Sequence, residues 1–339
     1  MRSFLVTGGA GFIGSNFVDL LVGRGDKVVV LDAMTYAGHK ENLEGNLSKI
    51  TFVQGDIADA NLVLKLLREH KVTHVVNFAA ESHVDRSITD AGSFVRTNVM
   101  GVFGMLQASL EHYGGLSGAD KDAFRFLHVS TDEVFGTLGE EGKFSEETAY
   151  APNSPYSASK AGGDHLVRAW YHTYKLPTLI TNCSNNYGPR QFPEKLIPYM
   201  ISCALQGKPL PVYGNGKNVR DWIHVEDHCS GILLAIEKGR LGEAYCFGGN
   251  AERRNIDVVK SICRILDERK PRGGGKSYEE LISFVEDRKG HDWRYAIDDS
   301  RAQRELGFTR KYSSFETGLA ATVDWYLSNQ TWMNAVLKK

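Results

Sequence analysis

Short apolar runs alternate with longer amphipathic stretches along the first half of the chain. The runs are SFLVTGG, KVVVLD, ITFVQGD, THVVNFAA and FRFLHVS, which begin at residues 3, 27, 50, 73 and 124. Continuous apolar runs of this length are typical of strands that are buried on both faces. Each run is followed by enough chain for a helix, and the first such stretch, FIGSNFVDLLVGRG, has apolar residues at helical spacing. The alternation predicts an α/β fold, a doubly wound parallel Rossmann sheet with helices on both faces.

This rhythm breaks in the second half, where five prolines fall between residues 189 and 211. The chain is expected to leave the sheet there, and the strand-like segment RDWIHVEDHCSGILLAI is expected to return to it. We therefore predict a first domain of residues 1–182 with a return segment at about 219–240. A smaller, interleaved C-terminal domain of residues 183–218 and 241–339 is expected to hold the substrate. Within it, the run KPRGGGKSYEEL is expected to be a flexible loop.

Composition narrows the class of protein. The chain has 339 residues, of which 42% are hydrophobic and 24% charged, values typical of a soluble globular protein. Forty basic and 41 acidic side chains leave a net charge of -1, which favours neither nucleic acid nor an anionic membrane as a partner. The five cysteines are odd in number and form no CxxC pair, so reduced, packed thiols are expected. No apolar stretch is long enough to span a bilayer and no signal-peptide pattern is visible, which predicts a cytoplasmic protein.

A glycine turn follows the first apolar run. VTGGAGFIGSNF spaces Gly8, Gly11 and Gly14 as G-x-x-G-x-x-G between the expected strand and helix. Glycine permits the tight turn and a close approach to a pyrophosphate, and the helix N-terminus supplies N–H donors to the anion. Asp32 closes the second strand about twenty residues later, where it would accept hydrogen bonds from a ribose and repel a 2′-phosphate. No arginine follows in DAMTYAG, so NAD is favoured over NADP; a glycine-rich turn without a ligand is the alternative.

A tyrosine and a lysine supply a candidate base. In NSPYSASKAGG, Ser154 is expected to cap a helix with Pro155 at its first position. Tyr156 and Lys160 then lie four residues apart on one helix face. Lowering a phenol pKa from about 10 to neutrality takes about 4 kcal/mol, comparable with one cation about 4 Å away at an effective dielectric of about 20. We predict that Lys160, helped by the positive nicotinamide, lowers the pKa of Tyr156; a solvated helix face is the alternative.

With these motifs in place, the sequence resembles a known family. TGGAGFIG, YSASK and NNYGP are similar to the extended short-chain dehydrogenase/reductases that act on nucleotide sugars, and the resemblance extends over essentially the whole chain. AAESHVDRSI, STDEVFG, QFPEKLIP, NVRDWIHVEDH and DRKGHDWRYAID narrow the resemblance to the dTDP-glucose 4,6-dehydratases. It implies NAD as cofactor, dTDP-glucose as substrate and a homodimer. The expected cofactor contacts are Gly8, Gly11, Phe12, Ile13, Gly14, Asp32, Asp56, Ile57, Ala79, Ala80, Tyr156 and Lys160.

The resemblance gives the two acids of STDEVFG a role. Direct loss of water across C5 and C6 of a hexose is prohibitive, because the C5 hydrogen is not acidic and hydroxide leaves poorly. Oxidation at C4, with Tyr156 accepting the hydroxyl proton and Thr131 bonded to the same oxygen, gives a ketone that acidifies C5–H. Glu133 is then expected to remove the C5 proton and Asp132 to protonate the departing C6 oxygen. Hydride returns to C6, so the NAD is restored and retained. The two adjacent acids are expected to perturb each other's pKa, which would help to keep Asp132 protonated.

Several alternatives stay open. Acids that follow a strand are commonly ordinary helix caps. A C4 epimerase or a decarboxylase would use Tyr156 and Lys160 but would have no role for both acids, and a dehydratase could act on another nucleotide sugar. A non-catalytic NAD-binding regulatory module is the alternative from a different class.

The nucleotide sugar is expected to be held by residues beyond the proline-rich break. By resemblance these are Asn185, Glu194, Lys195, Leu196, Pro211, Tyr213, Arg220, Asn255, Arg288 and His291. Arginine suits a diphosphate because its planar fork pairs with two oxygens. One position departs from the family pattern, since Phe135 stands where tyrosine is common.

Overall fold

A seven-stranded parallel sheet forms the larger part of the molecule. In the computed structural model, which describes residues 2–287 and 292–338, its strand order is β10-β6-β5-β4-β1-β2-β3. Neighbouring strands pair in parallel throughout. The strands are β1 (Ser3–Thr7), β2 (Lys27–Asp32), β3 (Thr51–Gln54), β4 (His74–Asn77), β5 (Arg125–Thr131), β6 (Thr178–Cys183) and β10 (Ala244–Phe247). The predicted doubly wound Rossmann sheet is confirmed.

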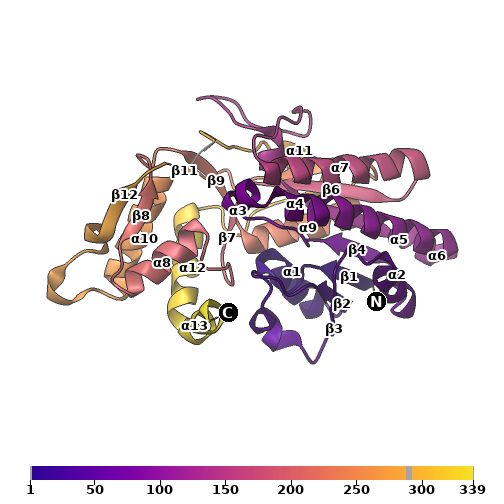
Figure 1. The fold of residues 1–339 in the computed structure, drawn as a ribbon, viewed down its shortest axis with the longest axis horizontal. Coiled ribbons are helices and arrows are strands. Elements are labelled where there is room, and N and C mark those ends of the chain that lie inside the picture. Colours follow the sequence, from indigo (N-terminus) through magenta and orange to yellow (C-terminus); the bar gives the residue numbers. More distant parts are fainter. Residues whose placement is uncertain (1, 288–291, 339) are drawn as a thin grey trace.

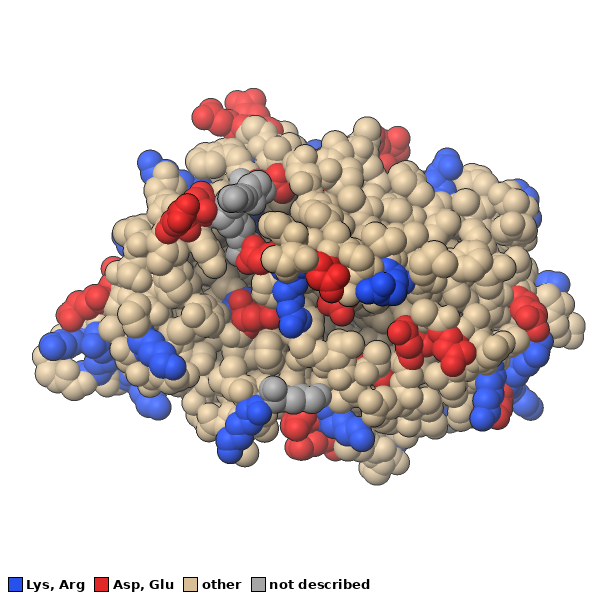
Figure 2. Space-filling model, in the orientation of Figure 1, with Lys and Arg blue, Asp and Glu red and all other residues tan. Residues whose placement is uncertain are grey.

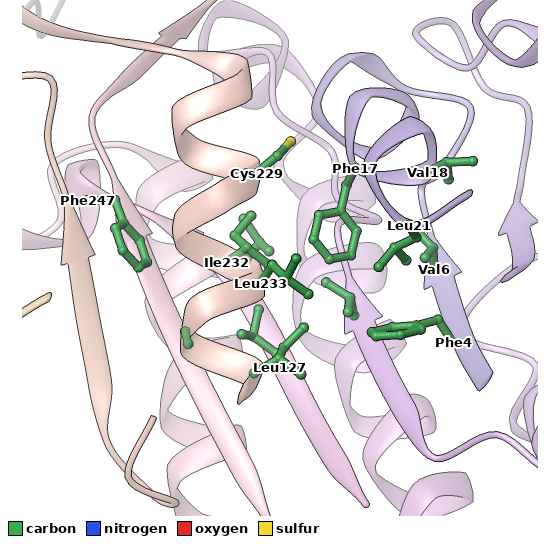
Figure 3. Packing of buried hydrophobic residues seen from close by; sticks show 14 of the residues in the cluster. Phe4, Val6, Phe17, Val18, Leu21, Leu127, Cys229, Ile232, Leu233 and Phe247 are labelled. Atoms are coloured by element: carbon green, nitrogen blue, oxygen red, sulfur yellow. The ribbon is translucent and has the colours of Figure 1, made fainter. Parts of the chain in front are cut away.

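Helices cover both faces of this sheet (Figure 1). One face carries α1 (Phe12–Gly23), α9 (Val225–Lys238) and α11 (Ser300–Leu306), and the other carries α2 (Ala60–Glu69), α5 (Val102–Gly115) and α7 (Pro155–Tyr174). Successive side chains of β1 alternate between the two cores: Phe4 and Val6 pack with α1 and α9, as Figure 3 shows, whereas Leu5 packs with α2 and α5. Both cores need apolar residues, which is why each strand reads as a continuous apolar run.

Shorter helical segments connect these elements. They are η1 (Lys40–Asn46), α3 (Val84–Thr89), α4 (Ala91–Val95), the π-helical turn η2 (Arg96–Gly101), α6 (Gly118–Ala123) and the 3₁₀ turn η3 (Asp132–Phe135). The last of these begins directly where β5 ends. Because the strands are parallel, the loops after β1, β2, β4, β5 and β6 all emerge at the same edge of the sheet. This is the edge where a doubly wound fold binds its ligands.

The smaller part of the molecule, on the left of Figure 1, combines small sheets with α-helices and 3₁₀ turns. One sheet has the order β11-β9-β7 and the other pairs β12 with β8. Their core includes Tyr187, Trp222, Phe315 and Tyr326. The elements are β7 (Asn185–Tyr187), α8 (Leu196–Leu205), β8 (Leu210–Tyr213), β9 (Val219–His224), β11 (Glu252–Arg254), α10 (Asn255–Arg269), η4 (Gly273–Gly275), η5 (Tyr278–Leu281), β12 (Ile282–Val285), α12 (Phe315–Ser328) and α13 (Gln330–Leu337).

The return to the large sheet differs from the expectation. The strand of the segment RDWIHVEDH, β9, does not join the large sheet but pairs with β7 and β11. Asp221 explains this placement, because its carboxylate accepts hydrogen bonds from the backbone N–H groups of Gly249 (3.1 Å) and Ala251 (2.7 Å), the turn that leads into β11. The helix that follows does return and packs on α1, and β10 supplies the seventh strand. The division of the chain into the two predicted domains stays a proposal.

Four further features bear on the sequence-based expectations. The run from Lys270 to Leu281 forms the 3₁₀ turns η4 and η5, and Ser277 caps the second of them. All five cysteines are free and buried, as predicted. Among residues 2–287 and 292–338, no helix combines the length and apolarity that a membrane crossing requires. Figure 2 shows acidic and basic side chains interspersed over the visible face, in keeping with the near-zero net charge.

Candidate active site

One cavity of about 360 Å³ lies at the carboxyl edge of the large sheet. Loops after β1, β2, β4, β5 and β6 and the helix α7 contribute to its wall. Every expected cofactor residue lines it, together with the three residues of the acid loop and three of the expected substrate residues. These are Gly8, Gly11, Phe12, Ile13, Gly14, Asp32, Asp56, Ile57, Ala79, Ala80, Thr131, Asp132, Glu133, Tyr156, Lys160, Asn185, Glu194 and Lys195.

The glycine turn forms one end of the cavity and leaves no room for side chains. Gly8 has a φ of +65°, and a Cβ there would lie 2.7 Å from the backbone nitrogen of Ala79. A Cβ on Gly14 would overlap the carbonyl oxygen of Gly8. Helix α1 begins just after the turn with Gly11 at its N-cap, and its first turn has no side-chain cap and no acidic residue. Its N-terminal N–H groups therefore suit an anion such as a pyrophosphate.

Asp32 lines the cavity at the end of β2 and is held by the backbone. One carboxylate oxygen accepts from the N–H of Ala10 (2.9 Å) and the other from the N–H of Met34 (2.8 Å). The side chain is buried, so its negative charge faces the cavity from a fixed position. This arrangement fits a ribose with free hydroxyl groups and opposes a phosphate there.

Helix α7 positions the tyrosine and the lysine. Ser154 caps it through the N–H of Ser157 and Pro155 is its first residue, as predicted. Tyr156 and Lys160 both face the cavity one turn apart. The Lys160 ammonium donates to the carbonyl oxygen of Val129 (2.8 Å) and lies 3.3 Å from Nε2 of His128.

The pKa of Tyr156 moves opposite to the expectation. Burial raises the pKa of this phenol well above its ordinary value, and the negative charge of Glu133 raises it further. Burial also lowers the pKa of Lys160, whose ammonium is directed to the carbonyl of Val129. The predicted lowering of the tyrosine pKa is therefore not produced by the polypeptide alone, because burial and the charge of Glu133 both disfavour the phenolate.

The two acids lie in different environments. The Thr131 hydroxyl caps η3 by accepting from the N–H of Glu133 (3.3 Å), and it donates to Oδ1 of Asp132 (3.3 Å). Asp132 is only 2% exposed, and its Oδ2 has no hydrogen-bond partner within the described residues. Burial, and then the charge of Glu133, raise the pKa of Asp132 well above its usual range, in the direction expected for adjacent acids. The neutral form is therefore favoured more strongly at Asp132 than at an exposed aspartate, and the carboxyl group of Glu133 beside it is less buried.

Phe135 completes the same turn and faces away from polar groups. Its ring stacks on Phe144 (5.3 Å between centroids) and meets Tyr150 edge-on (5.3 Å). It belongs to an apolar cluster that includes Val134 and Tyr295. The phenylalanine therefore fills a packed site next to the acids without a hydroxyl group to satisfy.

Five other expected substrate residues are described and lie in the smaller part, outside the lining of the cavity. Leu196 opens α8, Pro211 and Tyr213 lie on β8, and Asn255 opens α10. Arg220, on β9, is buried; its guanidinium donates to the carbonyl oxygens of residues 219, 292 and 293 and lies 4.3 Å from the ring centroid of Tyr295. Arg288 and His291 lie outside the described residues.

Sequence reasoning missed several polar residues of the cavity. Thr35 follows β2, Ser82 follows β4, and Thr97 comes from η2. Ser82 and Thr35 each lie a few residues beyond the end of a strand that was recognised, so the strand ends were the available signal. Thr97 sits in a π-helical turn that apolar periodicity does not reveal.

The fold and the cavity define a dinucleotide-binding α/β enzyme with a Tyr-x-x-x-Lys pair. A family model described as GDP-mannose 4,6 dehydratase matches residues 5–322. The dTDP-glucose 4,6-dehydratase of Xanthomonas campestris pv. campestris (strain B100) is 61% identical over 340 residues, covering 99% of this chain and 96% of that protein. The chain therefore belongs to the GDP-mannose 4,6-dehydratase family of nucleotide-sugar enzymes, and the resemblance to its dTDP-glucose 4,6-dehydratases is confirmed.

Two solved structures agree with this assignment. DesIV, a dTDP-glucose 4,6-dehydratase from Streptomyces venezuelae solved with NAD bound, superposes with a TM-score of 0.89 at 45% identity, over 99% of this chain and 100% of that one. The dTDP-glucose 4,6-dehydratase of Bacillus anthracis in complex with NAD gives a TM-score of 0.87 at 44% identity, with the same coverage.

Proposed function

We propose that this protein is an NAD-dependent dTDP-glucose 4,6-dehydratase, a hydro-lyase that forms dTDP-4-keto-6-deoxy-glucose. One observation carries the proposal: the acid pair Asp132 and Glu133 lines the same cavity as Tyr156, Lys160 and the glycine turn. The relatives named above, which cover the chain end to end, support the same activity and the same substrate.

The cavity residues fit NAD. The uncapped N-terminus of α1 suits the pyrophosphate, and the fixed carboxylate of Asp32 suits the adenosine ribose. Asp56 and Ile57 line the cavity and are proposed to contact the adenine ring, and Ala79 and Ala80 line the cavity beside the glycine turn. When bound, NAD supplies the acceptor for the C4 hydride and the donor that returns hydride to C6.

Tyr156 is proposed as the base that takes the C4 hydroxyl proton, with Thr131 hydrogen-bonded to the same sugar oxygen. Because burial and Glu133 raise its pKa, this role requires positive charge close to the phenol in the filled site. Lys160 provides one such charge from the next turn of α7. The hydroxyl of Thr131 already donates to the carboxyl group of Asp132 and accepts from the backbone N–H of Glu133, so one residue connects the proposed oxidation site with the acid pair.

Asp132 and Glu133 are proposed to divide the elimination between them. Glu133 removes the C5 proton as general base, and Asp132 gives its proton to the C6 oxygen as general acid. The raised pKa of Asp132 suits the acid role, since it favours the proton-bearing form that a general acid needs. An epimerase or a decarboxylase would leave both acids without a task.

The sugar nucleotide is proposed to extend from the cavity toward the smaller part. Asn185, Glu194 and Lys195 line the cavity, so they are placed to contact it first. Leu196, Pro211, Tyr213, Arg220, Asn255, Arg288 and His291 are proposed to hold the rest of the nucleotide by their match to the family pattern. Release of Arg220 from its carbonyl partners would free its fork for the diphosphate.

Incubation with dTDP-glucose in deuterated water tests the activity. The expected product is a 4-keto-6-deoxy sugar that carries solvent deuterium at C5, because the proton removed there exchanges before the new one is added. A C4 epimer without deuterium at C5 would indicate an epimerase. Binding of NAD without conversion of any nucleotide-glucose would indicate a regulatory module, and a panel of nucleotide-glucoses would identify the preferred base.

A homodimer is proposed on an apolar face shared by α4, η2, α5 and α7. Val95, Met100, Phe103 and Tyr174 are large apolar residues with 49%, 53%, 37% and 50% exposure. Phe103 and Tyr174 both pack against Trp170, so the exposed residues of α5 and α7 adjoin. Met100→Glu combined with Phe103→Glu should reduce the mass in light scattering to that of a monomer, whereas Leu47→Glu, an exposed leucine outside this face, should leave a dimer. An unchanged mass for the double variant would contradict the proposal.

A cytoplasmic location is proposed as well. Five free, buried thiols are in keeping with a reducing compartment.

A further inference from the structure

Asp164 is a further buried acid, one helical turn beyond Lys160. The proposed chemistry gives this side chain no role. The side chain of Asp164, on α7, is 1% exposed. Its Oδ2 accepts hydrogen bonds from the hydroxyl groups of Ser130 (2.7 Å) and Tyr150 (2.9 Å). Its Oδ1 makes no hydrogen bond within the described residues and lies 3.5 Å from Nε2 of His128. Burial raises the pKa of Asp164 to about 6, and the two hydroxyl donors act against that rise because they stabilise the ionised carboxylate.

His128 stands between Lys160 and Asp164 and is held from β4. The N–H of Ala79 donates to the hydroxyl oxygen of Thr7 (3.4 Å), which donates to Oδ1 of Asn77 (2.5 Å). The Asn77 amide nitrogen lies 3.0 Å from Nδ1 of His128, and Nε2 lies 3.3 Å from the Lys160 nitrogen and 3.5 Å from Oδ1 of Asp164. Burial and Lys160 lower the pKa of His128 well below its usual value, so the ring is neutral.

Among the described groups that face it, Lys160 has one charged neighbour of opposite sign. From β5 it meets the neutral His128 and the carbonyl of Val129, and from β6 it faces the thiol of Cys183, whose pKa is raised. On its own helix Tyr156 lies one turn before it and Asp164 one turn after it, and Asp164 raises the pKa of Lys160 against the lowering by burial. An isolated buried ammonium loses its proton readily, because desolvation disfavours the charge.

We propose that Asp164 is a positioning residue for the dehydratase reaction: its clamped carboxylate is the buried counter-charge that keeps Lys160 an ammonium next to Tyr156. The proposal rests on the proposed role of Lys160. It assigns the hydroxyl groups of Ser130 and Tyr150 the task of keeping Asp164 ionised, and it assigns His128 the task of a neutral spacer between the two charges.

Asp164→Asn tests this by removing the charge while keeping the shape. The variant should lower kcat at least about tenfold with a KM for dTDP-glucose within about twofold of the wild type. Lys160 should lose its proton at lower pH, so the alkaline limb of the kcat profile should move down by about one pH unit. The Cε resonance of Lys160 in ¹³C-lysine-labelled protein, assigned by its loss in Lys160→Met, should titrate at correspondingly lower pH.

Tyr150→Phe is the matched variant, because it keeps the charge of Asp164 and removes one donor. The pKa of Asp164 is raised to about 6 by burial, with Tyr150 acting to lower it. Without that donor Asp164 should protonate at higher pH, so the acid limb should move up while the alkaline limb stays in place. This variant also supplies the test should Asp164→Asn fail to fold.

Opposite results would overturn the proposal. A folded Asp164→Asn protein with wild-type kcat and an unmoved alkaline limb would do so. So would a lower melting temperature with an unchanged Lys160 titration, since that describes a merely structural residue. If the wild-type protein itself converted no dTDP-glucose, the proposed function would fail first, and the Lys160 titration would still report on Asp164.

Discussion

Gly14 lies against Gly8 so closely that a methyl group on Gly14 would overlap the carbonyl oxygen of Gly8. Gly14→Ala must therefore displace the turn that supports the proposed pyrophosphate site. We expect at least a tenfold loss of NAD affinity, measured by calorimetry or by the cofactor content of the purified protein. Gly23→Ala, in the same helix but with no atom within 4 Å of its new Cβ, should retain NAD fully. Equal NAD content in both variants would contradict the proposed placement.

Glu133→Gln should separate oxidation from elimination. Removal of a general base typically costs 10²- to 10⁴-fold in rate, so kcat should fall by about that factor while KM stays nearly constant. Oxidation at C4 does not need Glu133, so the absorbance of reduced nicotinamide should rise and persist after substrate is added. Glu147→Gln, at an exposed position fourteen residues on, is the control and should behave as the wild type. Undiminished turnover in Glu133→Gln would refute the assignment of the base.

Asp132→Asn should stabilise the fold and impair the reaction. Burial and Glu133 raise the pKa of Asp132 in the folded protein, so the unfolded chain releases this proton more easily than the native state. The wild type therefore loses stability as the pH rises above about 4, where the aspartate of the unfolded chain ionises. The variant lacks this loss, because asparagine is neutral at every pH. The melting temperature of the variant should exceed that of the wild type more at pH 8 than at pH 5, with kcat reduced. An equal difference at both pH values would contradict a raised pKa.

Asp227→Ala should destabilise the connection between α9 and the C-terminal region. The buried carboxylate accepts from the N–H groups of Lys311 (2.7 Å) and Tyr312 (3.1 Å). Its removal leaves two backbone donors without their acceptors, at a cost of about 1–3 kcal/mol for each group that stays buried. Chemical denaturation should show this loss, whereas Glu226→Gln, at the neighbouring exposed position, should cost under about 1 kcal/mol. A loss confined to catalysis would show that the contact does not support the fold.

Features that depend on a short stretch of chain could be predicted. The cap at Ser154, the first-turn proline and the glycine turn each depend on a few adjacent residues, and all are present in the structure. The strand positions followed from continuous apolar runs, because both faces of the sheet are buried. In the same way, Asp132 and Glu133 could be placed in the cavity because they directly follow a recognised strand.

Features that depend on distant partners were harder to predict. The segment of β9 looks like any buried strand, and its sheet is decided by Asp221 and the turn near Gly249, twenty-eight residues later. The pKa of Tyr156 could not be derived from its spacing to Lys160, because the opposing contributions come from burial and from Glu133 on another element. The role of Asp164 could not be predicted for the same reason, since its partners Ser130 and Tyr150 come from other segments.

Strand β9 ends at His224, and the same residue caps α9 through the N–H of Glu226, so no linker separates the small sheet from the helix on the large one. Because β10 and α11 then return to the large sheet before the chain ends in α13, a single cut cannot divide the protein into two intact halves. A fragment that stopped after β6 would lack α9 and would expose to solvent the apolar side chains of Phe17 and Leu21, which pack against that helix. Such an exposed apolar surface favours aggregation. In this chain, exchange of surface loops would leave the core intact, whereas exchange of either half as a contiguous segment would cut through it.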